Sequence, residues 1–541
     1  MKKTLIALGS FAVIAIAAFM VFKPSPPKPA PMQARPLVIG FENDVVSFDT
    51  LRLGDVFALR VASQIFEGLA RLDENNRVVP GVAESWIHSP DFTTWTFRLR
   101  DGVKFHPYPA LDEASRALTA EDVIFSFTRM LSKDAVTAGP LASIIKGAKA
   151  YQEGKSEKVS GLRLVSRREV EFSLLRPDAL FPGRISSPAY SIVKKAVIEK
   201  AGADFGQTVG VGTGPFQFVE RRGNELVLHR YDQYWSGNQG PETLVFRTVK
   251  EDTVRLAEAK AGQLDITYAT PPMLAGLVER DGERLKVRQD SSTALAIESF
   301  PIFNTNFLAF NWPKVDPDLR RAVALSIDRE QIVAAVVPVS GTAAPGPIPL
   351  ACAGYHSKVT AVRDLRAAKI ALDAYRARNP GVVPTLRLLS HELAQSVPIS
   401  EVIQSQLKEV GIEVVIVQQS FNAVVGLLQK GDFEAVVIGF EYAYSKPQLM
   451  LETYLTSAAI PIPNVFQYSK PENDAAIAAL FITDDEAVSL EQAADVEKRL
   501  VDDVPGVFLF QTRQVMLLNR AIQGAKFNGA NYPILTKTNW K

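Results

Sequence analysis

Apolar and polar residues are most clearly ordered between Gln64 and Phe127. Trp95, Phe97 and Leu99 alternate with polar residues, which predicts a half-buried strand. The polar run 73–76 lies between apolar runs and predicts a hairpin turn. Thr119 stands three residues before Asp122, a spacing that predicts a helix N-terminus with a capping box. The apolar pattern before this stretch predicts a helix over Val56–Leu69.

Further along the chain, apolar strand patterns alternate with helical ones. Strands are predicted over 386–389, 412–417 and 435–440, and helices over 365–375, 401–410 and 423–428. This βαβα alternation predicts a parallel sheet with crossover helices.

Weaker patterns predict a hairpin of 162–165 with 170–174, a helix over Ala189–Ala201, and two final strands at 507–510 and 515–518. The glycine-rich run 210–214 precedes Pro215 and an alternating Phe216/Phe218 strand, so it opens a strand. No G-x-x-x-x-G-K-[ST] motif occurs, and a nucleotide site is not expected.

Composition narrows the class of protein. The 541 residues suffice for two or three packed lobes, with 47% hydrophobic and 22% charged residues. The net charge of +1 and the lack of basic runs with interleaved aromatics predict no nucleic-acid partner. Cys352 is the only cysteine, which excludes an intrachain disulfide and a cysteine-based metal cluster.

The first 36 residues have the pattern of an export signal. Lys2 and Lys3 precede an uncharged apolar run, residues 4–22, and a proline-rich segment follows Lys23. Cleavage after the small-residue motif 15–17 would release a periplasmic protein. An uncleaved run would instead anchor the protein at the outer face of the cytoplasmic membrane, since about 20 apolar residues span a bilayer. Both outcomes stay open, and no nearby cysteine allows lipoprotein anchoring.

A series of spaced motifs carries a family resemblance: EGL at 67–69, VVP at 78–80, AESW at 83–86, WTFRLRDGVKFH at 95–106, LTAEDV at 118–123 and GVGTGPF at 210–216. In this order they resemble the family-5 extracytoplasmic solute-binding proteins of ABC importers, the peptide- and nickel-binding group. The resemblance covers nearly the whole chain from Leu37.

The resemblance implies an α/β fold: a two-lobed periplasmic binding protein (type II, cluster C-like) with an extra α+β subdomain in the first lobe. The implied segments are a signal peptide or anchor (1–22), a linker (23–36), lobe I (37–75 and 205–300), its subdomain (76–204), lobe II (301–504) and a return to lobe I (505–541). Hinge crossings are expected near Ser299–Asn304 and Ala487–Val507.

The resemblance also places the ligand between a first-lobe loop and a second-lobe segment. The predicted ligand-binding residues are Asp44, Val45, Val46, Ser47, Gly439, Phe440, Glu441, Tyr442 and Ala443. In peptide-binding relatives an aspartate at the position of Ala443 pairs with the ligand's ammonium. A buried ammonium needs a carboxylate partner, so Glu441 or Asp44 would have to replace it. Phe440, Tyr442 and Tyr444 would form apolar walls, or they simply pack in the core or the hinge.

The expected function is therefore capture of a short peptide and its delivery to an ABC permease, by a monomer that closes around its ligand without cofactor, metal or catalysis. The alternatives are a carrier of nickel chelate, haem or sugar, and a membrane-anchored ligand sensor. An acyl-transfer enzyme is a third: Ser191 and Lys194 match Ser-x-x-Lys, but Ser-Asp-Asn and Lys-Thr-Gly are missing. The five histidines form no zinc-binding motif.

Overall fold

The structure is a computed structural model that describes residues 35–136, 138–281, 284–288, 294–392, 395–442 and 446–541. The chain divides into Met1–Pro36, almost all outside the described residues, and one compact unit, Leu37–Lys541.

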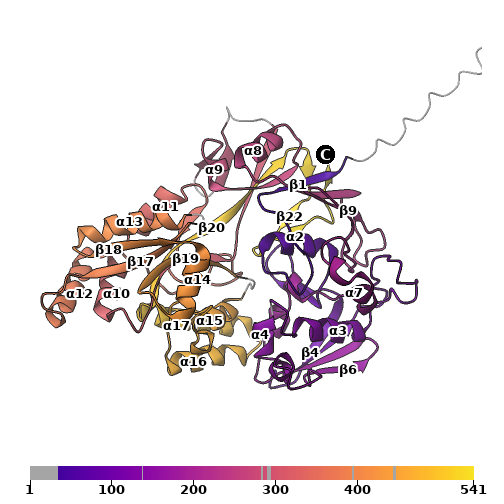
Figure 1. Ribbon diagram of the computed structural model, residues 1–541, viewed down its shortest axis with the longest axis horizontal. Coiled ribbons are helices and arrows are strands. Elements are labelled where there is room, and N and C mark those ends of the chain that lie inside the picture. The colour runs from indigo at the N-terminus through magenta and orange to yellow at the C-terminus, as the bar shows by residue number, and fades with distance from the viewer. Residues whose placement is uncertain (1–34, 137, 282–283, 289–293, 393–394, 443–445) are drawn as a thin grey trace, which may run out of the picture. The chain divides into compact units, whose positions relative to one another are not determined.

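A twelve-stranded mixed sheet connects both lobes of this unit, in the order β18-β17-β19-β15-β20-β11-β1-β10-β9-β8, with β14 and β16 also paired to β20 (Figure 1). The strands of the first lobe are β1 (Leu37–Phe41), β8 (Phe216–Arg222), β9 (Glu225–Arg230), β10 (Thr243–Thr248), β11 (Ile266–Ala269) and β14 (Leu295–Pro301). Those of the second lobe are β15 (Asn304–Phe310), β16 (Gly341–Ala343), β17 (Thr385–His391), β18 (Glu413–Gln419) and β19 (Ala435–Glu441).

Strand β20 (Gly506–Asn519) is shared by the two lobes. Its first half pairs with β15 and β16, and its second half pairs with β14 and β11. The prediction of two separate strands here is wrong, because Gln511–Gln514 continue the pairing between them. One chain crossing lies between β14 and β15, inside the predicted 299–304. The other lies within β20 and not at Ala487–Val507, since α17 (Glu486–Asp502) packs in the core of the second lobe.

The predicted parallel βαβα unit is confirmed in the second lobe. Strands β17 and β18 pair in parallel, as do β17 and β19. The helices of this lobe are α10 (Pro317–Ser326), α11 (Arg329–Val336), α12 (Leu365–Arg378), α13 (Ser396–Glu409), α14 (Phe421–Lys430), α15 (Pro447–Leu455), α16 (Pro471–Ala478) and α17. On β15, Phe307 and Ala309 enter one core and Leu308 and Phe310 the other, because successive side chains of a strand point to opposite faces.

The subdomain of the first lobe contains its own antiparallel sheet, in the order β4-β5-β7-β6. Its strands are β4 (Ala83–His88), β5 (Thr94–Leu99), β6 (Leu162–Ser166) and β7 (Glu169–Ser173), which confirms the predicted hairpin of β6 with β7. Helix α3 (Ala120–Met130) begins with the predicted capping box of Thr119 and Asp122. The remaining helices before β14 are α2 (Val56–Ile65), α4 (Ala138–Ala142), α5 (Ala148–Gln152), α6 (Phe181–Arg184), α7 (Lys195–Ala201), α8 (Asp252–Lys260) and α9 (Pro271–Leu274).

Two predicted helices are shorter than expected. The helix predicted over 189–201 begins only at Lys195, because the backbone N–H of Ile192 donates to Glu67 O and that of Val193 to Ser126 Oγ. Helix α2 ends at Ile65 and not at Leu69, because residues 66–69 bond to other loops: Gly81 N–H donates to Leu69 O. In both places tertiary hydrogen bonds outweigh a local helical pattern.

Candidate functional site

The predicted first-lobe loop, residues 44–47, follows β1, and its residues differ in their exposure and in their contacts. Asp44 is exposed and its carboxylate pairs with Lys250 Nζ at 2.7 Å, and this hydrogen bond lowers the pKa of Asp44. Val45 is buried, whereas Val46 is 78% exposed. Ser47 Oγ accepts the backbone N–H of Asp49 at 3.1 Å and so stabilises the loop itself. The charge of Asp44 thus already has a partner within the protein.

The predicted second-lobe segment lies at the carboxyl end of β19. Phe440 packs against Phe307 and Tyr454, with ring centroids 5.1 and 4.5 Å apart. Tyr442 is buried, and its hydroxyl donates to Pro347 O at 3.1 Å. Both aromatic rings therefore contribute to the core of the second lobe. Ala443 and Tyr444 lie outside the described residues.

The end of β19 has an open backbone edge. On one side β15 pairs with it as far as Glu441. On the other side β17 pairs only through Leu388–Ala435 and Leu389–Val436. Within the described residues, the backbone of Gly439–Glu441 therefore has a neighbouring strand on one side only. An extended ligand could add to such an edge as a further strand.

Glu441 is the exposed acidic residue at this edge. Although its side chain reaches solvent, the surrounding protein raises the pKa of its carboxyl by desolvation; Arg60 opposes this rise and Glu42 adds to it. Glu42 and Arg60 belong to the first lobe: Glu42 directly follows β1, and Arg60 lies on α2. Residues of both lobes thus interact electrostatically with one carboxylate.

Around Arg60 lies a group of buried polar atoms that lack hydrogen-bond partners. The Cζ atom of Arg60 lies 3.5 Å from the ring centroid of Tyr268, and its Nε donates to Asn531 O at 3.2 Å. Arg60 Nη1, Tyr268 OH and Glu42 Oε2 are all buried and have no hydrogen-bond partner among the residues that the structure describes. We call Glu42, Arg60 and Tyr268 the first-lobe triad.

Sequence reasoning missed the first-lobe triad. A signal for Arg60 was present, because it is the only charged residue in the ten-residue helix α2. Nothing local pointed to Tyr268, which lies on β11 more than 200 residues further along the chain. Because β11 pairs in parallel with β1, its carboxyl end lies at the same sheet edge as Glu42.

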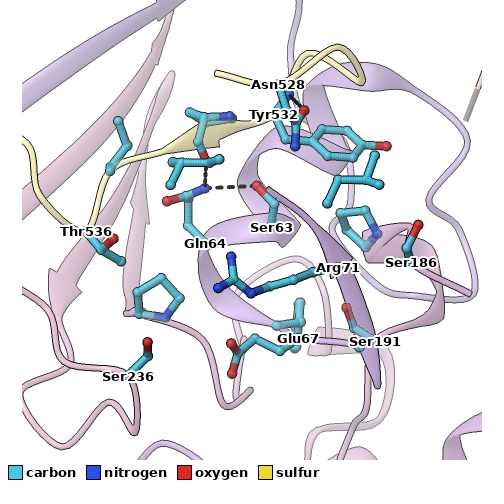
Figure 2. Close-up of a pocket in the computed structure, with 18 of the residues that line it drawn as sticks. Ser63, Gln64, Glu67, Arg71, Ser186, Ser191, Ser236, Asn528, Tyr532 and Thr536 are labelled. Carbon is cyan, nitrogen blue, oxygen red and sulfur yellow. Dashed lines mark hydrogen bonds between the residues drawn. The ribbon is translucent and has the colours of Figure 1, made fainter. Parts of the chain in front are cut away.

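A separate pocket of about 120 Å³ lies between α2, residues 186–191 and the segment 528–536. Figure 2 shows the guanidinium of Arg71 between the side chains of Gln64 and Glu67. Glu67 is buried and accepts hydrogen bonds from Tyr234 OH, Trp235 Nε1 and Thr213 Oγ1 at 2.7, 2.9 and 3.0 Å. Its carboxylate therefore connects the EGL motif to Tyr234 and Trp235, which is a structural role.

The residues of the Ser-x-x-Lys motif are not arranged for acyl transfer. Lys194 Nζ bonds to Asp122 Oδ2 at 2.9 Å and to Ala117 O at 3.2 Å. Ser191 is buried, and both residues lie before the start of α7. Burial also raises the pKa of the Cys352 thiol far above its usual range. Neither the Ser191 hydroxyl nor the Cys352 thiol has the surroundings of an activated nucleophile.

The described part of the chain lacks two features that would point to other functions. No cluster of three His, Cys, Asp or Glu side chains there is placed to hold a metal ion. No helix there combines the length and the apolar character needed to cross a bilayer. The predicted export segment 4–22 falls outside these residues.

Comparison with known proteins gives consistent matches. The family model described as bacterial extracellular solute-binding proteins, family 5 Middle, matches residues 77–461. The dipeptide-binding protein of Escherichia coli (strain K12) is 27% identical over 399 residues, which cover 71% of this chain and 71% of that protein.

Two solved structures are similar in fold. The structure of HbpA2 from Haemophilus parasuis has a TM-score of 0.79 at 21% identity and covers 94% of this chain and 100% of that chain. The dipeptide binding protein from Pseudoalteromonas sp. SM9913, solved in complex with Met-Leu, has a TM-score of 0.73 at 21% identity, with the same coverage.

Proposed function

Because this chain belongs to the bacterial extracellular solute-binding proteins of family 5, we propose that it captures a short peptide between its two lobes. The observation that carries this proposal is Glu441. It is an exposed carboxylate at the open end of β19, and it interacts electrostatically with Glu42 and Arg60 of the first lobe.

The strand edges support a peptide as the ligand. In open α/β sheets, ligands bind outside the carboxyl ends of the strands. Glu42 directly follows the carboxyl end of β1, and Glu441 is the last residue of β19. A peptide can pair its backbone with the open edge of Gly439–Glu441, while its ammonium pairs with Glu441. Two matched relatives are named as dipeptide-binding proteins, one of them in complex with Met-Leu.

Glu441 replaces the missing aspartate better than Asp44 does. Lys250 already neutralises Asp44. When both are ionised, the carboxylates of Glu42 and Glu441 exceed the one guanidinium of Arg60 by one negative charge. A single ligand ammonium would neutralise this charge and relieve the repulsion between Glu42 and Glu441.

The remainder of the function follows from family membership and from the sequence. We infer that the protein acts as a monomer outside the cytoplasmic membrane, either cleaved or anchored through residues 4–22, and delivers its ligand to an ABC permease. Capture shifts the protein from an open to a closed state and involves no covalent chemistry.

The test is isothermal titration calorimetry with Ala-Ala and N-acetyl-Ala-Ala on protein refolded to remove co-purified ligand. We expect Ala-Ala to bind and the acetylated peptide to bind at least tenfold more weakly, because a charge-assisted hydrogen bond contributes about 1.5–3 kcal/mol. Glu441→Gln should weaken Ala-Ala binding similarly. Glu413→Gln, at an exposed carboxylate on β18, is the matched control.

Binding of haem, a nickel chelate or a sugar in place of a panel of peptides would refute the peptide proposal. It would favour the carriers of other solutes that the sequence leaves open.

A further inference from the structure

The first-lobe triad places three unsatisfied polar atoms of complementary type in one part of the lobe. Arg60 Nη1 is a donor, Glu42 Oε2 is an acceptor, and Tyr268 OH can be either. Arg60 and Tyr268 are only 3% and 2% exposed. A buried polar atom without a partner costs about 1–3 kcal/mol, and more when it is charged, so three together call for a common explanation.

The two charged residues of the triad, Glu42 and Arg60, do not pair with each other among the described residues, although both lie near Tyr268. Arg60 and Glu42 both influence the pKa of Tyr268, which burial raises to about 12, so its hydroxyl keeps its proton at neutral pH. The same two residues influence Glu441. Nevertheless Glu42 and Arg60 form no ion pair among the described residues, and Arg60 Nε instead bonds to Asn531 O. The arrangement leaves a donor and an acceptor without hydrogen-bond partners among the described residues.

We propose that the first-lobe triad recognises the α-aminoacyl end of the peptide, an inference that rests on the function proposed above. Glu42 shares the ligand's ammonium with Glu441, while Arg60 Nη1 and Tyr268 OH donate to the carbonyl oxygen of the ligand's first residue. An α-aminoacyl group has its ammonium and its carbonyl oxygen only a few bonds apart. This short separation suits the triad, in which the acceptor Glu42 and the donors Arg60 and Tyr268 are neighbours.

Charge balance favours a carbonyl over a carboxylate as the partner of Arg60. The two glutamates and the guanidinium carry a net charge of −1, which one ammonium neutralises. A ligand carboxylate beside that ammonium would restore an uncompensated charge in partly desolvated surroundings. A neutral carbonyl satisfies Arg60 and Tyr268 without this cost.

Tyr268→Phe is the sharpest test, because it removes only a hydroxyl that has no hydrogen-bond partner in the described part of the chain. The melting temperature of the free protein should stay the same or rise, while Ala-Ala should bind about tenfold more weakly. Wild-type protein should also prefer Ala-Ala to β-alanyl-Ala, in which one more methylene separates the ammonium from the carbonyl. The variant should lose most of this preference.

Tyr468→Phe is the matched control. Its hydroxyl donates to Asp503 Oδ2 at 2.6 Å in the core of the second lobe, so the variant should melt at a lower temperature and bind Ala-Ala as the wild type does. If Tyr268→Phe binds Ala-Ala with unchanged affinity and preference, the inference is overturned while the peptide function stands. If wild-type protein binds no peptide, both are overturned.

Discussion

His106 makes the stability of the first lobe sensitive to mild acid. The side chain is buried; its Nε2–H donates to Gly214 O at 2.9 Å, and its Nδ1 accepts the backbone N–H of Gly212 at 3.3 Å. Both ring nitrogens of neutral His106 thus form hydrogen bonds. The proton is assigned to Nε2 because the partner of that nitrogen, a carbonyl oxygen, can only accept. The pKa of His106 falls from 6.5 to about 4, chiefly through desolvation; the hydrogen bond to Gly214 opposes this fall and nearby Arg116 contributes to it.

The sign and size of the effect follow from this difference. Below pH 6.5 the unfolded chain binds a proton at His106 that the folded protein does not, so the free energy of unfolding decreases as the pH falls. One pKa unit corresponds to about 1.4 kcal/mol, so the fall from 6.5 to about 4 corresponds to about 3 kcal/mol in total. Between pH 7.5 and 4.5 most of this, about 2–3 kcal/mol, should be lost.

Urea unfolding of wild-type protein and of His106→Gln over this pH range tests the reasoning. Other groups titrate in both proteins and cancel in the difference, so the stability advantage of the wild type should shrink by about 2–3 kcal/mol toward pH 4.5. His229→Gln, at an exposed histidine on β9, should show no such trend. A constant difference between His106→Gln and wild type at all pH values would refute the argument.

Three further predictions concern residues whose surroundings are equally well defined. Glu67→Ala would leave the donors of three side chains unsatisfied in the core, so the free energy of unfolding should fall by at least about 2 kcal/mol in chemical denaturation. Native Cys352 is 3% exposed, so a maleimide should label it slowly in buffer and rapidly in urea; fast native labelling would contradict its burial. Asp44→Asn should leave peptide affinity within about twofold of wild type in calorimetry, because an exposed ion pair with Lys250 holds that carboxylate; a tenfold loss would show that Asp44 binds the ligand.

Elements with strong local signals could be read from the sequence. The capping box of Thr119 and the alternation of apolar runs around β17 and β18 depend on neighbours only a few residues apart, and both are confirmed. The spaced motifs from Glu67 to Phe216 identified the family for the same reason, since their order is a property of the chain alone. The helix predicted from Ala189 failed where the backbone of Ile192 bonds to Glu67 O, which no local pattern encodes.

The candidate site depended on tertiary structure. From the sequence, Glu441 was a candidate for the missing carboxylate and Asp44 was another, and only folding brought Lys250 beside Asp44 and placed Glu42 and Arg60 near Glu441. The first-lobe triad was invisible in the sequence, because a residue's type does not show whether its polar atoms find partners. That depends on which distant segments meet, and parallel pairing of β1 with β11 brings Glu42 and Tyr268 to one sheet edge although 226 positions separate their numbers. The sequence therefore determined the family and the local elements, while the packing of distant strands decided which charged groups found a partner among the described residues.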